Sequence, residues 1–334
     1  MTIREQLEQR EIEYLSPYAS LSVNSKGRKR EEPQCDIRPV YQRDRDRILH
    51  CKAFRRLKQK TQVFLLPKGD HYRTRLTHTL EVSQTARTIA KALQLNEELV
   101  EAISLGHDLG HTPFGHAGER ALNSVCPNGF KHNEQSVRVV EVLEKDGKGL
   151  NLTWEVIDGI RNHQTVGRPA TLEGQIVRLS DKIAYINHDI DDAVRGGIIS
   201  EEDIPKDLRS TLGDSVRARL NTLIHDVITN SMGRPEIIMS EEVGDAMAEL
   251  RKYMFKNVYV NPQAKGEETK AIQMIEKLYF YYEDHINLLP KQYLDRLDVG
   301  DTEEQIVCDY IAGMTDTYAV KKFEDLFVPK SWNF

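Results

Sequence analysis

The 334-residue sequence lacks the features that mark several large classes of protein. It contains no run of about 18 apolar residues, which excludes a membrane-spanning helix. Its first residues are polar and charged, so we expect no secretory signal. Glycine and proline number 20 and 12 and are not clustered, which argues against a disordered or collagen-like chain. We therefore expect a soluble, globular, cytoplasmic protein without a membrane partner.

Cysteine is scarce, and the charge is nearly balanced. The four cysteines are Cys35, Cys51, Cys126 and Cys308; none forms a CxxC pair, and their spacing matches no thiolate zinc site. We interpret all four as inert thiols of a reduced protein. A formal net charge of −6 argues against a general nucleic-acid-binding protein, but leaves room for a local basic patch.

Helical periodicity dominates the chain, and strand-like alternation is short and rare. The clearest pattern is an apolar stripe with spacings of three or four residues, formed by Ile176, Leu179, Ile183, Ile186, Ile190 and Val194. A helix is predicted over residues 74–95, with Leu76 and Leu80 among its buried residues. Asn96, followed by two glutamates, predicts the N-cap of another helix that runs to Gly106. The fold class predicted from these patterns is all-α.

The chain divides into three predicted regions. Residues 1–42 are polar and interrupted by prolines and a glycine, and we interpret them as an N-terminal arm or irregular lead-in. Residues 43–260 are the predicted core. Residues 261–334 are a predicted helical extension packed on that core.

A basic run occupies residues 43–60, where eight lysines and arginines face only Asp44 and Asp46. Such a run is most often a solvated helix face. The alternative is an anion site or a contact between subunits. On this segment alone the solvated face is the favoured interpretation.

Two histidines and two aspartates have the character of a metal site. His107 and Asp108 are adjacent at the end of a predicted helix, His78 lies 29 residues before His107 on the preceding helix, and Asp181 lies 73 residues after Asp108. Two imidazoles and two carboxylates suit a divalent metal that keeps open positions for water and substrate. The alternative for any one of these histidines is a capping or core residue.

The segment HDLGHTPFGHAGE, residues 107–119, strengthens the case for a site. It contains three histidines together with glycines and a proline, and its helix propensity is poor. Stability alone does not explain such a composition. Its glycines would let the backbone approach a ligand closely.

Five motifs resemble those of one enzyme family. They are RTRLTHTLEV (73–82), HDLGHTPFGHAGE (107–119), HNEQS (132–136), Asp181-Lys182 with Tyr185 and Asp189, and DYIAGMTD (309–316). Together they resemble the bacterial dGTPase-like family of HD-domain deoxynucleoside-triphosphate triphosphohydrolases, which is related to the vertebrate SAM-and-HD-domain dNTPases. The resemblance extends from about residue 43 to residue 327. It implies an HD-domain helical fold with additional C-terminal helices.

The resemblance also implies an activity and a cofactor. Members hydrolyse a dNTP at the α-phosphorus to deoxynucleoside and inorganic tripolyphosphate, and dGTP is among the expected substrates. The metal ligands would be His78, His107, Asp108 and Asp181. Mn²⁺ or Mg²⁺ is the expected metal, and Zn²⁺, Ni²⁺ or Fe²⁺ would also suit. A homo-oligomer is implied, with a nucleotide effector or single-stranded DNA as further partners.

Catalytic roles follow from the resemblance together with the chemistry. The leaving group is a 5′-alkoxide, so a general acid should contribute roughly 10²–10⁴ in rate. His116 is the best candidate, and Glu119, three residues later, would orient its ring and raise its pKa. His132 and His111 resemble further active-site histidines.

Substrate contacts are expected on two helices. Arg75 and Lys182 match phosphate-contacting positions of the family, and Gln59 matches a position that contacts the sugar. Tyr185 and Asp189 match the residues that read the sugar. Independently of the family, Asp181, Tyr185 and Asp189 are spaced i, i+4 and i+8, opposite the isoleucine stripe. This polar face suits a pocket wall, and the alternative is an ordinary amphipathic surface helix. A second phosphate-side segment is expected at Arg251, Lys252, Lys256 and Tyr259.

Two other functions compete with this one. An HD-type nucleotidase or phosphodiesterase would release monophosphate, and a nucleic-acid-binding regulatory protein would hold only a vestigial site. The intact set of four metal ligands argues against the second alternative. Thr317 follows the MTD triplet, where many relatives carry a basic residue, and this change concerns assembly or regulation.

Overall fold

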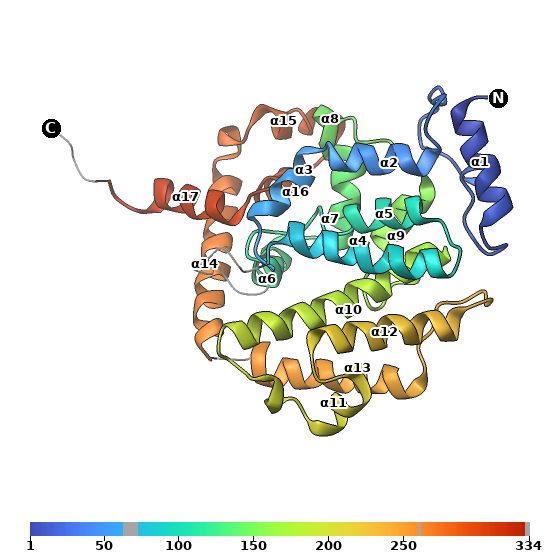
Figure 1. Ribbon diagram of the computed structural model, residues 1–334. Coiled ribbons are helices and arrows are strands. Elements are labelled where there is room, and N and C mark those ends of the chain that lie inside the picture. The colour runs from blue at the N-terminus through green and yellow to red at the C-terminus, as the bar shows by residue number, and fades with distance from the viewer. Residues whose placement is uncertain (63–72, 260–261, 331–334) are drawn as a thin grey trace. The chain divides into compact units, whose positions relative to one another are not determined.

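The computed structural model describes residues 1–62, 73–259 and 262–330, and this part of the chain is helical (Figure 1). Its only β-type pairings are isolated bridges, between Arg28 and Thr153 and between Thr61 and Thr74. The predicted all-α class is therefore confirmed. None of the helices in these ranges combines the length and the apolar character that crossing a bilayer requires. The chain forms two compact units, which are described separately below.

The first unit comprises Met1–Cys51, Thr77–His107 and Leu150–Asn261. Its helices are α1 (Ile3–Tyr14), α2 (Val40–Leu49), α4 (Arg75–Ala92), α5 (Glu97–Gly106), α9 (Trp154–Arg161), α10 (Leu172–Arg195), α11 (Lys206–Leu212), α12 (Val216–Ser231) and α13 (Glu241–Met254). The first two residues of α4 belong to the second unit.

Helix α5 is the central helix of the first unit and packs against α2, α9 and α10. Every residue from Leu99 to Gly106 is buried except Glu101. Asn96 caps the helix as predicted, because its side chain accepts from the backbone N–H groups of Glu98 and Leu99. At the other end, a Cβ on Gly106 would lie 2.5 Å from the Cδ1 of Ile160. Glycine therefore lets α5 approach α9 closely, and His107 follows at a buried helix end.

Helix α10 buries the predicted isoleucine stripe. Ile176, Ile183, Ile186 and Ile190 are fully or almost fully buried. Leu179 and Val194 are half-buried. Glu173 in the first turn is also buried and accepts from the backbone N–H groups of Ser20 and Asn96. These bonds connect the start of α10 to the lead-in segment and to the start of α5.

The first 40 residues are more ordered than the predicted irregular lead-in. They contain the 12-residue helix α1, which begins with a capping box formed by Thr2 and Glu5. Further along, buried Asp44 forms an ion pair with Arg28 and accepts from the backbone N–H and hydroxyl of Thr153. The pattern of prolines correctly excluded one long helix, but it did not show that long-range polar contacts hold the segment in place.

Helix α4 corrects one detail of the predicted core. Leu80 was expected to be buried, but its side chain is 49% exposed. His78 and Thr79 are instead the buried residues of this turn. At about 100° per residue, Leu80 lies about 200° from His78 around the helix and therefore faces away from it. The helix directs a polar edge inward at the position where the sequence predicts a ligand.

The basic run is divided between the two units. In the first unit Arg43 and Arg47 pair with Glu32, and Arg45 pairs with Glu98. These arginines are half-buried and paired with carboxylates of their own unit, so this part of the run is less solvated than predicted. In the second unit, Arg56 and Lys60 donate to backbone carbonyls at the C-terminal end of α16, those of Gly313 and Ala312 respectively. Cations at this helix end are favourable because they complement the helix dipole.

The second unit comprises Lys52–Leu76, Asp108–Gly149 and Pro262–Phe334. Its helices are α3 (Lys52–Arg56), α6 (Gly115–Val125), α7 (His132–Arg138), α8 (Glu144–Gly147), α14 (Pro262–Asp284), α15 (Lys291–Leu294), α16 (Glu303–Ala312) and α17 (Asp316–Phe327).

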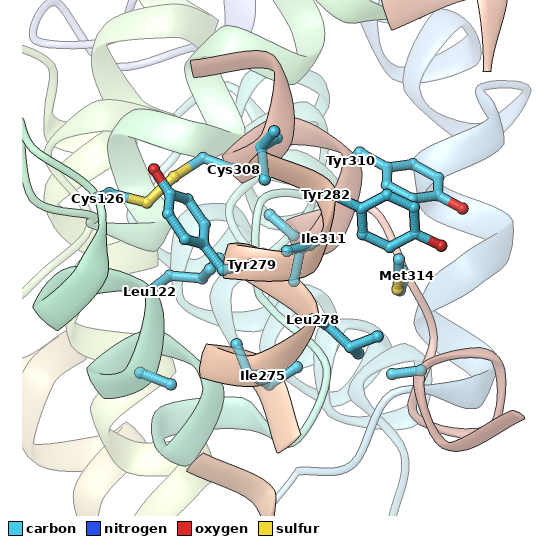
Figure 2. Packing of buried hydrophobic residues seen from close by; sticks show 14 of the residues in the cluster. Leu122, Cys126, Ile275, Leu278, Tyr279, Tyr282, Cys308, Tyr310, Ile311 and Met314 are labelled. Carbon is cyan, nitrogen blue, oxygen red and sulfur yellow. A yellow bond between two sulfur atoms is a disulfide. The ribbon is translucent and has the colours of Figure 1, made fainter. Parts of the chain in front are cut away.

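The core of the second unit joins α6, α14 and α16. Leu122 from α6, Ile275 and Leu278 from α14, and Ile311 from α16 are fully buried side chains in this cluster (Figure 2). Tyrosines add to it, and the rings of Tyr282 and Tyr310 meet edge to face with centroids 5.1 Å apart. C-terminal helices thus supply much of the core against which α6 is positioned.

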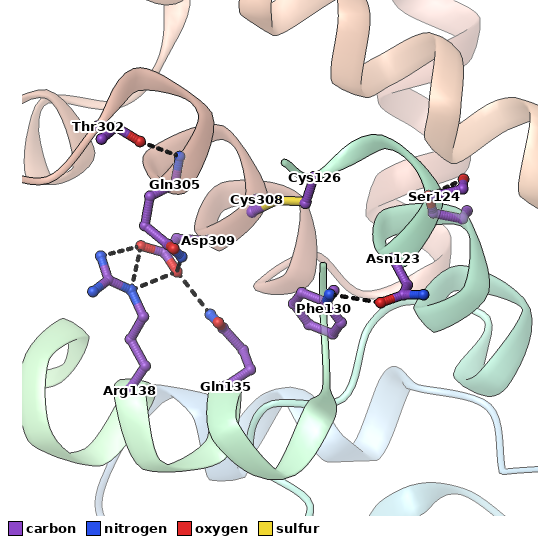
Figure 3. The surroundings of a disulfide bond; sticks show 11 residues. Asn123, Ser124, Cys126, Phe130, Gln135, Arg138, Thr302, Gln305, Cys308 and Asp309 are labelled. Atoms are coloured by element: carbon purple, nitrogen blue, oxygen red, sulfur yellow. Dashed lines mark hydrogen bonds and ion pairs between the residues drawn. A yellow bond between two sulfur atoms is a disulfide. The ribbon is translucent and has the colours of Figure 1, made fainter. Parts of the chain in front are cut away.

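The cysteines depart from the prediction of four inert thiols. Cys126 at the end of α6 and Cys308 on α16 form a disulfide, although 182 positions separate them in the sequence (Figure 3). The packing of α6 and α16 in one core brings them together, and no sequence spacing reveals such a pair. Cys51 is buried and forms no disulfide. Hydrogen bonds from the backbone of Arg38 and Ile37 lower the pKa of Cys35, the other cysteine outside the disulfide, to about 7.

The disulfide leads to a simple prediction about thiol number. In denaturant without reductant, a thiol reagent should label two cysteines, Cys35 and Cys51, and all four after reduction. Reduction should also lower the stability to unfolding by about 2–4 kcal/mol, because the bond restricts the unfolded chain. Mass spectrometry of the labelled protein and thermal melts with and without reductant measure both effects. Labelling of four thiols in the unreduced protein would show that the bond is absent.

Candidate active site and metal centre

Three predicted metal ligands meet within the first unit. His78 on α4 and Asp181 on α10 are hydrogen-bonded, with 3.1 Å between Nε2 and Oδ1. The Nε2 of His107 lies 3.8 Å from the same oxygen of Asp181. Both imidazoles are buried, and their ring centroids are 5.8 Å apart. Two nitrogens thus face one carboxylate oxygen, which is an arrangement suited to a divalent cation.

The orientation of His107 is set by its own helix. Its Nδ1 lies 2.6 Å from the carbonyl oxygen of Ser104, one turn earlier in α5. A carbonyl only accepts, so Nδ1 carries the proton and Nε2 holds the lone pair of the neutral ring. A backbone carbonyl on one nitrogen and a metal on the other is the usual environment of a ligating histidine. His107 therefore combines a capping role with a ligand's orientation.

Asp181 is ionised in this environment. Burial raises the pKa of its carboxyl group, but the hydrogen bond with His78 and the nearby imidazoles outweigh burial and hold that pKa well below its ordinary value. A carboxylate that stays charged in a largely buried place requires positive partners. The hydrogen bond with His78 compensates part of the negative charge, and a bound cation would compensate the rest.

Asp108 follows His107 directly in the chain and is the first residue of this segment in the second unit. Its Oδ2 accepts from the guanidinium of Arg75 at 2.9 Å, and both side chains are buried. Its Oδ1 lies 3.2 Å from the Nε2 of His111. Arg75, predicted to contact phosphate, is therefore held by a carboxylate that was predicted to hold metal.

Three histidines gather around Glu119 in the second unit. One carboxylate oxygen of Glu119 lies 2.9 Å from the Nδ1 of His132 and accepts from the backbone N–H of the same residue, also at 2.9 Å. The other oxygen lies 3.2 Å from the Nδ1 of His116. The rings of His111 and His132 are stacked, with centroids 3.9 Å apart. The predicted contact between Glu119 and His116 is present, and Glu119 also holds His132.

Burial distinguishes these histidines from one another. The side chain of His116 is 70% exposed, whereas those of His111 and His132 are buried. Burial, helped by the charges of Arg75 and His132, holds the pKa of His111 well below its ordinary value. Burial raises the pKa of Glu119, but hydrogen bonds with His116 and His132 outweigh it and keep the group ionised. Of the three rings, His116 is the accessible one.

A second group of metal-type donors lies in this unit. Ligand atoms of Asp108, His111 and His132 all fall within 4.8 Å of one another, and all three residues are buried. His111 and His132 were predicted as catalytic residues and not as ligands. Asp108, one of the predicted metal ligands, is therefore close to two of the predicted catalytic residues.

The polar face of α10 carries the predicted sugar contacts. Tyr185 is half-buried, and the guanidinium of Arg251 lies 5.9 Å from its ring centroid. Asp189 is buried and accepts from the hydroxyl of Tyr259. Burial raises the pKa of Tyr185 to about 12, so its hydroxyl remains protonated. The face therefore presents an aromatic ring and a held carboxylate, as its spacing predicted.

The positions of the other predicted substrate residues say less about how substrate would bind. Lys182 is half-buried beside this face, and burial together with the charges of Arg178 and Arg251 lowers its pKa. Gln59 is exposed in a short 3₁₀ turn of the second unit. Lys252 is exposed and pairs with Glu249 at 2.5 Å, whereas Lys256 is exposed on the adjoining π-helical segment.

Two buried histidines near the metal ligands were missing from the prediction. The ring of His163 lies 5.0 Å from that of His107, and its Nδ1 contacts the carbonyl of Ile160 at 2.7 Å. The ring of His188 lies 5.7 Å from that of His78, and its Nε2 is 3.1 Å from Glu81. His188 is seven residues after Asp181, so helical spacing could have revealed it. His163 precedes α10 in an irregular segment, where no periodicity marks it.

Comparison with known proteins explains why these residues occur together. A model of the HD domain matches residues 75–186, and a model of the phosphohydrolase-associated domain matches residues 237–325. The deoxyguanosinetriphosphate triphosphohydrolase-like protein of Caldanaerobacter subterraneus subsp. tengcongensis is 59% identical over 332 residues, covering 99% of this chain and 98% of that protein. The protein of the same description from Clostridium perfringens strain SM101 is 51% identical over 342 residues, covering 99% of both. The chain belongs to this HD-domain family.

Solved structures show the same fold. A phosphohydrolase from Bacteroides thetaiotaomicron VPI-5482 matches with a TM-score of 0.53 at 18% identity, covering 85% of this chain and 68% of that one. At this identity the likeness concerns the fold alone. The predicted family is confirmed by the two domain models and the close relatives. HD-domain membership makes the protein a hydrolase of the metal-dependent phosphohydrolase type.

The HD-family metal fits the donor set of this chain. The first unit supplies two buried imidazoles that face a charged carboxylate, and a backbone carbonyl sets the tautomer of one ring. Nitrogen and carboxylate donors together suit Mn²⁺, Fe²⁺ or Zn²⁺, and carboxylate with water suits Mg²⁺. The donor chemistry therefore agrees with a metal without choosing among these ions.

Removal of one donor should remove the metal. We expect His107→Ala and Asp181→Ala to weaken Mn²⁺ binding at least about tenfold, because each deletes a direct ligand. His225→Ala is the matched control, because His225 is an exposed histidine of the same unit. Calorimetric titration with Mn²⁺, together with circular dichroism to confirm the helical fold, measures the effect. A folded variant with full metal occupancy would rule out the residue it replaces as a ligand.

Proposed function

We propose that this protein hydrolyses deoxynucleoside triphosphates, dGTP among them, to deoxynucleoside and inorganic tripolyphosphate. The observation that carries the proposal is the contact of Glu119 with two histidines, one buried and one exposed, in a chain of the dGTPase-like HD family. This arrangement provides a held proton donor, which the 5′-oxygen leaving group of such a reaction requires. The similar proteins are described as deoxyguanosinetriphosphate triphosphohydrolase-like, and dGTP belongs to the proposed substrate class.

The proposed metal ligands are His78, His107, Asp108 and Asp181, with Mn²⁺ or Mg²⁺ as the expected ion. When bound, the metal would polarise a phosphoryl oxygen and lower the pKa of bound water. His78, His107 and Asp181 support this assignment by their mutual distances. Asp108 supports it through its position next to His107 and its ion pair with Arg75.

His116 is the proposed general acid. It is exposed and therefore accessible to substrate, and Glu119 holds its Nδ1, so the opposite nitrogen can present a proton. The carboxylate stabilises the imidazolium, and the ring returns to the neutral form when it gives its proton to the departing 5′-oxygen. His132 and His111 are buried beside it, and we assign them to the same catalytic group. Glu119 holds both His116 and His132 in place.

Cations for the triphosphate are proposed at Arg75 and Lys182. Burial lowers the pKa of Lys182, and the nearby positive charges of Arg178 and Arg251 lower it further. Such an excess of positive charge favours a bound anion. Arg75 is oriented by Asp108 and can offer its remaining donors to phosphate oxygens. Charge spread over phosphoryl oxygens is stabilised by groups of this kind.

The sugar is proposed to lie against Tyr185 and Asp189. The ring would pack on the deoxyribose, and the carboxylate would accept from the 3′-hydroxyl. Tyr259 donates to Asp189, so we reassign it from the phosphate side to the support of the sugar contact. Gln59 remains a predicted sugar contact on the strength of the family motif. A homo-oligomer, a nucleotide effector and a single-stranded DNA partner likewise remain predictions.

The bond that breaks distinguishes the proposed activity from its alternatives. In ¹⁸O-water with Mn²⁺, hydrolysis of dGTP should place the label in tripolyphosphate and leave the deoxynucleoside unlabelled, because water attacks the α-phosphorus. Mass spectrometry of both products measures this. Sequential release of single phosphates would instead indicate the nucleotidase alternative. Salt-dependent binding of single-stranded DNA without hydrolysis of any dNTP would indicate the vestigial site.

The proposed sugar wall, formed by Tyr185 and Asp189, predicts that deoxyribonucleotides are hydrolysed faster than ribonucleotides. We expect dGTP to be hydrolysed at least about tenfold faster than GTP at equal concentration, which corresponds to about 1.4 kcal/mol in the transition state. Tyr185→Ala should reduce this ratio because it removes the surface that crowds a 2′-hydroxyl. Tyr14→Ala, at an exposed tyrosine of α1, is the matched control. Competition assays with both nucleotides measure the ratio. An unchanged preference in Tyr185→Ala would exclude this wall.

A further inference from the structure

The corner between α16 and α17, residues 312–316, contains a buried carboxylate with an unexpected set of partners. Asp316 is the first residue of α17, yet it is only 2% exposed. An aspartate at this position ordinarily serves its own helix end. Here Thr315 already caps the helix, because its hydroxyl accepts from the backbone N–H of Tyr318. The carboxylate of Asp316 is therefore available for other segments.

Both oxygens of Asp316 accept hydrogen bonds from distant parts of the second unit. Its Oδ1 accepts from the backbone N–H of Phe114 at 3.0 Å. Its Oδ2 accepts from the backbone N–H of Thr61 at 3.0 Å and also from the Thr61 hydroxyl. One side chain thus joins the corner to the residue before α6 and to the segment that precedes α4. Three hydrogen bonds to one buried carboxylate hold its side chain in a fixed orientation.

The backbone of Phe114 has an uncommon conformation that requires support from its surroundings. Its backbone is left-handed, with φ 61° and ψ 24°, and Gly115 follows with φ 54°. A bulky residue rarely adopts this conformation, and it persists only where its surroundings enforce it. Phe114 is the N-cap position of α6, and its side chain makes no capping bond. The hydrogen bond to Asp316 therefore holds the turn from which α6 starts, two residues before His116.

The other end of the same turn is tied to the same corner. Buried Lys60 donates from Nζ to the carbonyl of His111 and, at 2.8 Å, to the carbonyl of Ala312. Residues 111–114 are thus held at one end through Lys60 and at the other through Asp316. Both attachments lead to residues 312–316, which lie in the part of the chain matched by the phosphohydrolase-associated domain.

We propose that Asp316 is a positioning residue that sets the direction of His116 by holding Phe114 in its left-handed conformation. The corner at residues 312–316 then acts on the proton donor without touching substrate. This inference rests on the proposed function only where turnover is measured. The geometry of the turn, and its effect on the contact between His116 and Glu119, can be measured without any substrate.

The test compares substitutions that remove different shares of these bonds. Asp316→Ala removes all three, Asp316→Asn retains one acceptor oxygen for Phe114, and Thr61→Val removes only the hydroxyl bond. We expect kcat for dGTP to fall at least about tenfold in Asp316→Ala and less in Asp316→Asn and Thr61→Val, with KM and bound Mn²⁺ unchanged. Asp325→Asn is the control, because Asp325 is an exposed carboxylate on the same helix.

A double substitution separates positioning from general destabilisation. If Asp316 acts through His116, the variant His116→Ala/Asp316→Ala should be no slower than His116→Ala alone. Additive losses would overturn the proposal. So would a folded Asp316→Ala variant with kcat within about twofold of the parent. If Asp316→Ala does not fold, Asp316→Asn and Thr61→Val test the proposal in its place. A kcat equal to that of the parent in both variants would overturn it.

Nuclear magnetic resonance of the imidazole nitrogens tests the proposal without any measurement of turnover. In substrate-free protein, Asp316→Asn should shift the nitrogen resonances of His116 because its contact with Glu119 changes, whereas Asp325→Asn should not. Unchanged His116 resonances in Asp316→Asn and Asp316→Ala would overturn the inference. If the parent protein hydrolyses no dNTP, the proposed function fails, but this measurement still tests the positioning of His116.

Discussion

The close packing of α5 inside the first unit is the constraint on which the site depends. A helix buried on nearly all sides must bring its end into the interior, and here Gly106 lets that end approach α9 to a distance that a side chain would prevent. His107 then lies at a buried helix terminus, where the carbonyl of Ser104 directs one ring nitrogen and leaves the other facing Asp181. The ligand geometry is thus a consequence of helix packing and capping, since the same groups would close the helix without any metal.

Charge is organised around a small number of buried carboxylates. Asp181 faces two imidazoles, Glu119 holds two more, and Asp316 accepts from three donors in the second unit. Each would be costly to bury alone, and each is compensated by groups that the proposed chemistry uses or that hold its turn in place. The proposed catalytic segments are therefore stabilised by the same type of interaction that we propose for the binding of substrate.

Several features could be predicted because they depend on short-range periodicity. The isoleucine stripe of α10, the Asn96 cap and the i, i+3 contact of His116 with Glu119 all follow from the geometry of a single helix. The exposure of Leu80 was predicted wrongly, because an apolar residue says little about which edge of a helix faces inward when that edge carries ligands. The ordered lead-in was also underestimated, because Glu173 and Asp44 fix it through contacts that are distant in sequence.

The sequence by itself determined the helical class and the family, and it supplied the histidines and carboxylates that we propose for the chemistry, because these are properties of residue type and local spacing. Only the tertiary structure decided that Cys126 meets Cys308, that His163 and His188 surround the ligand pair, and that Asp316 holds Phe114. In each of these cases the partners come from different elements. Their proximity results from how helices pack in a shared core, and helical periodicity describes one face of one helix without naming the surface that it will meet.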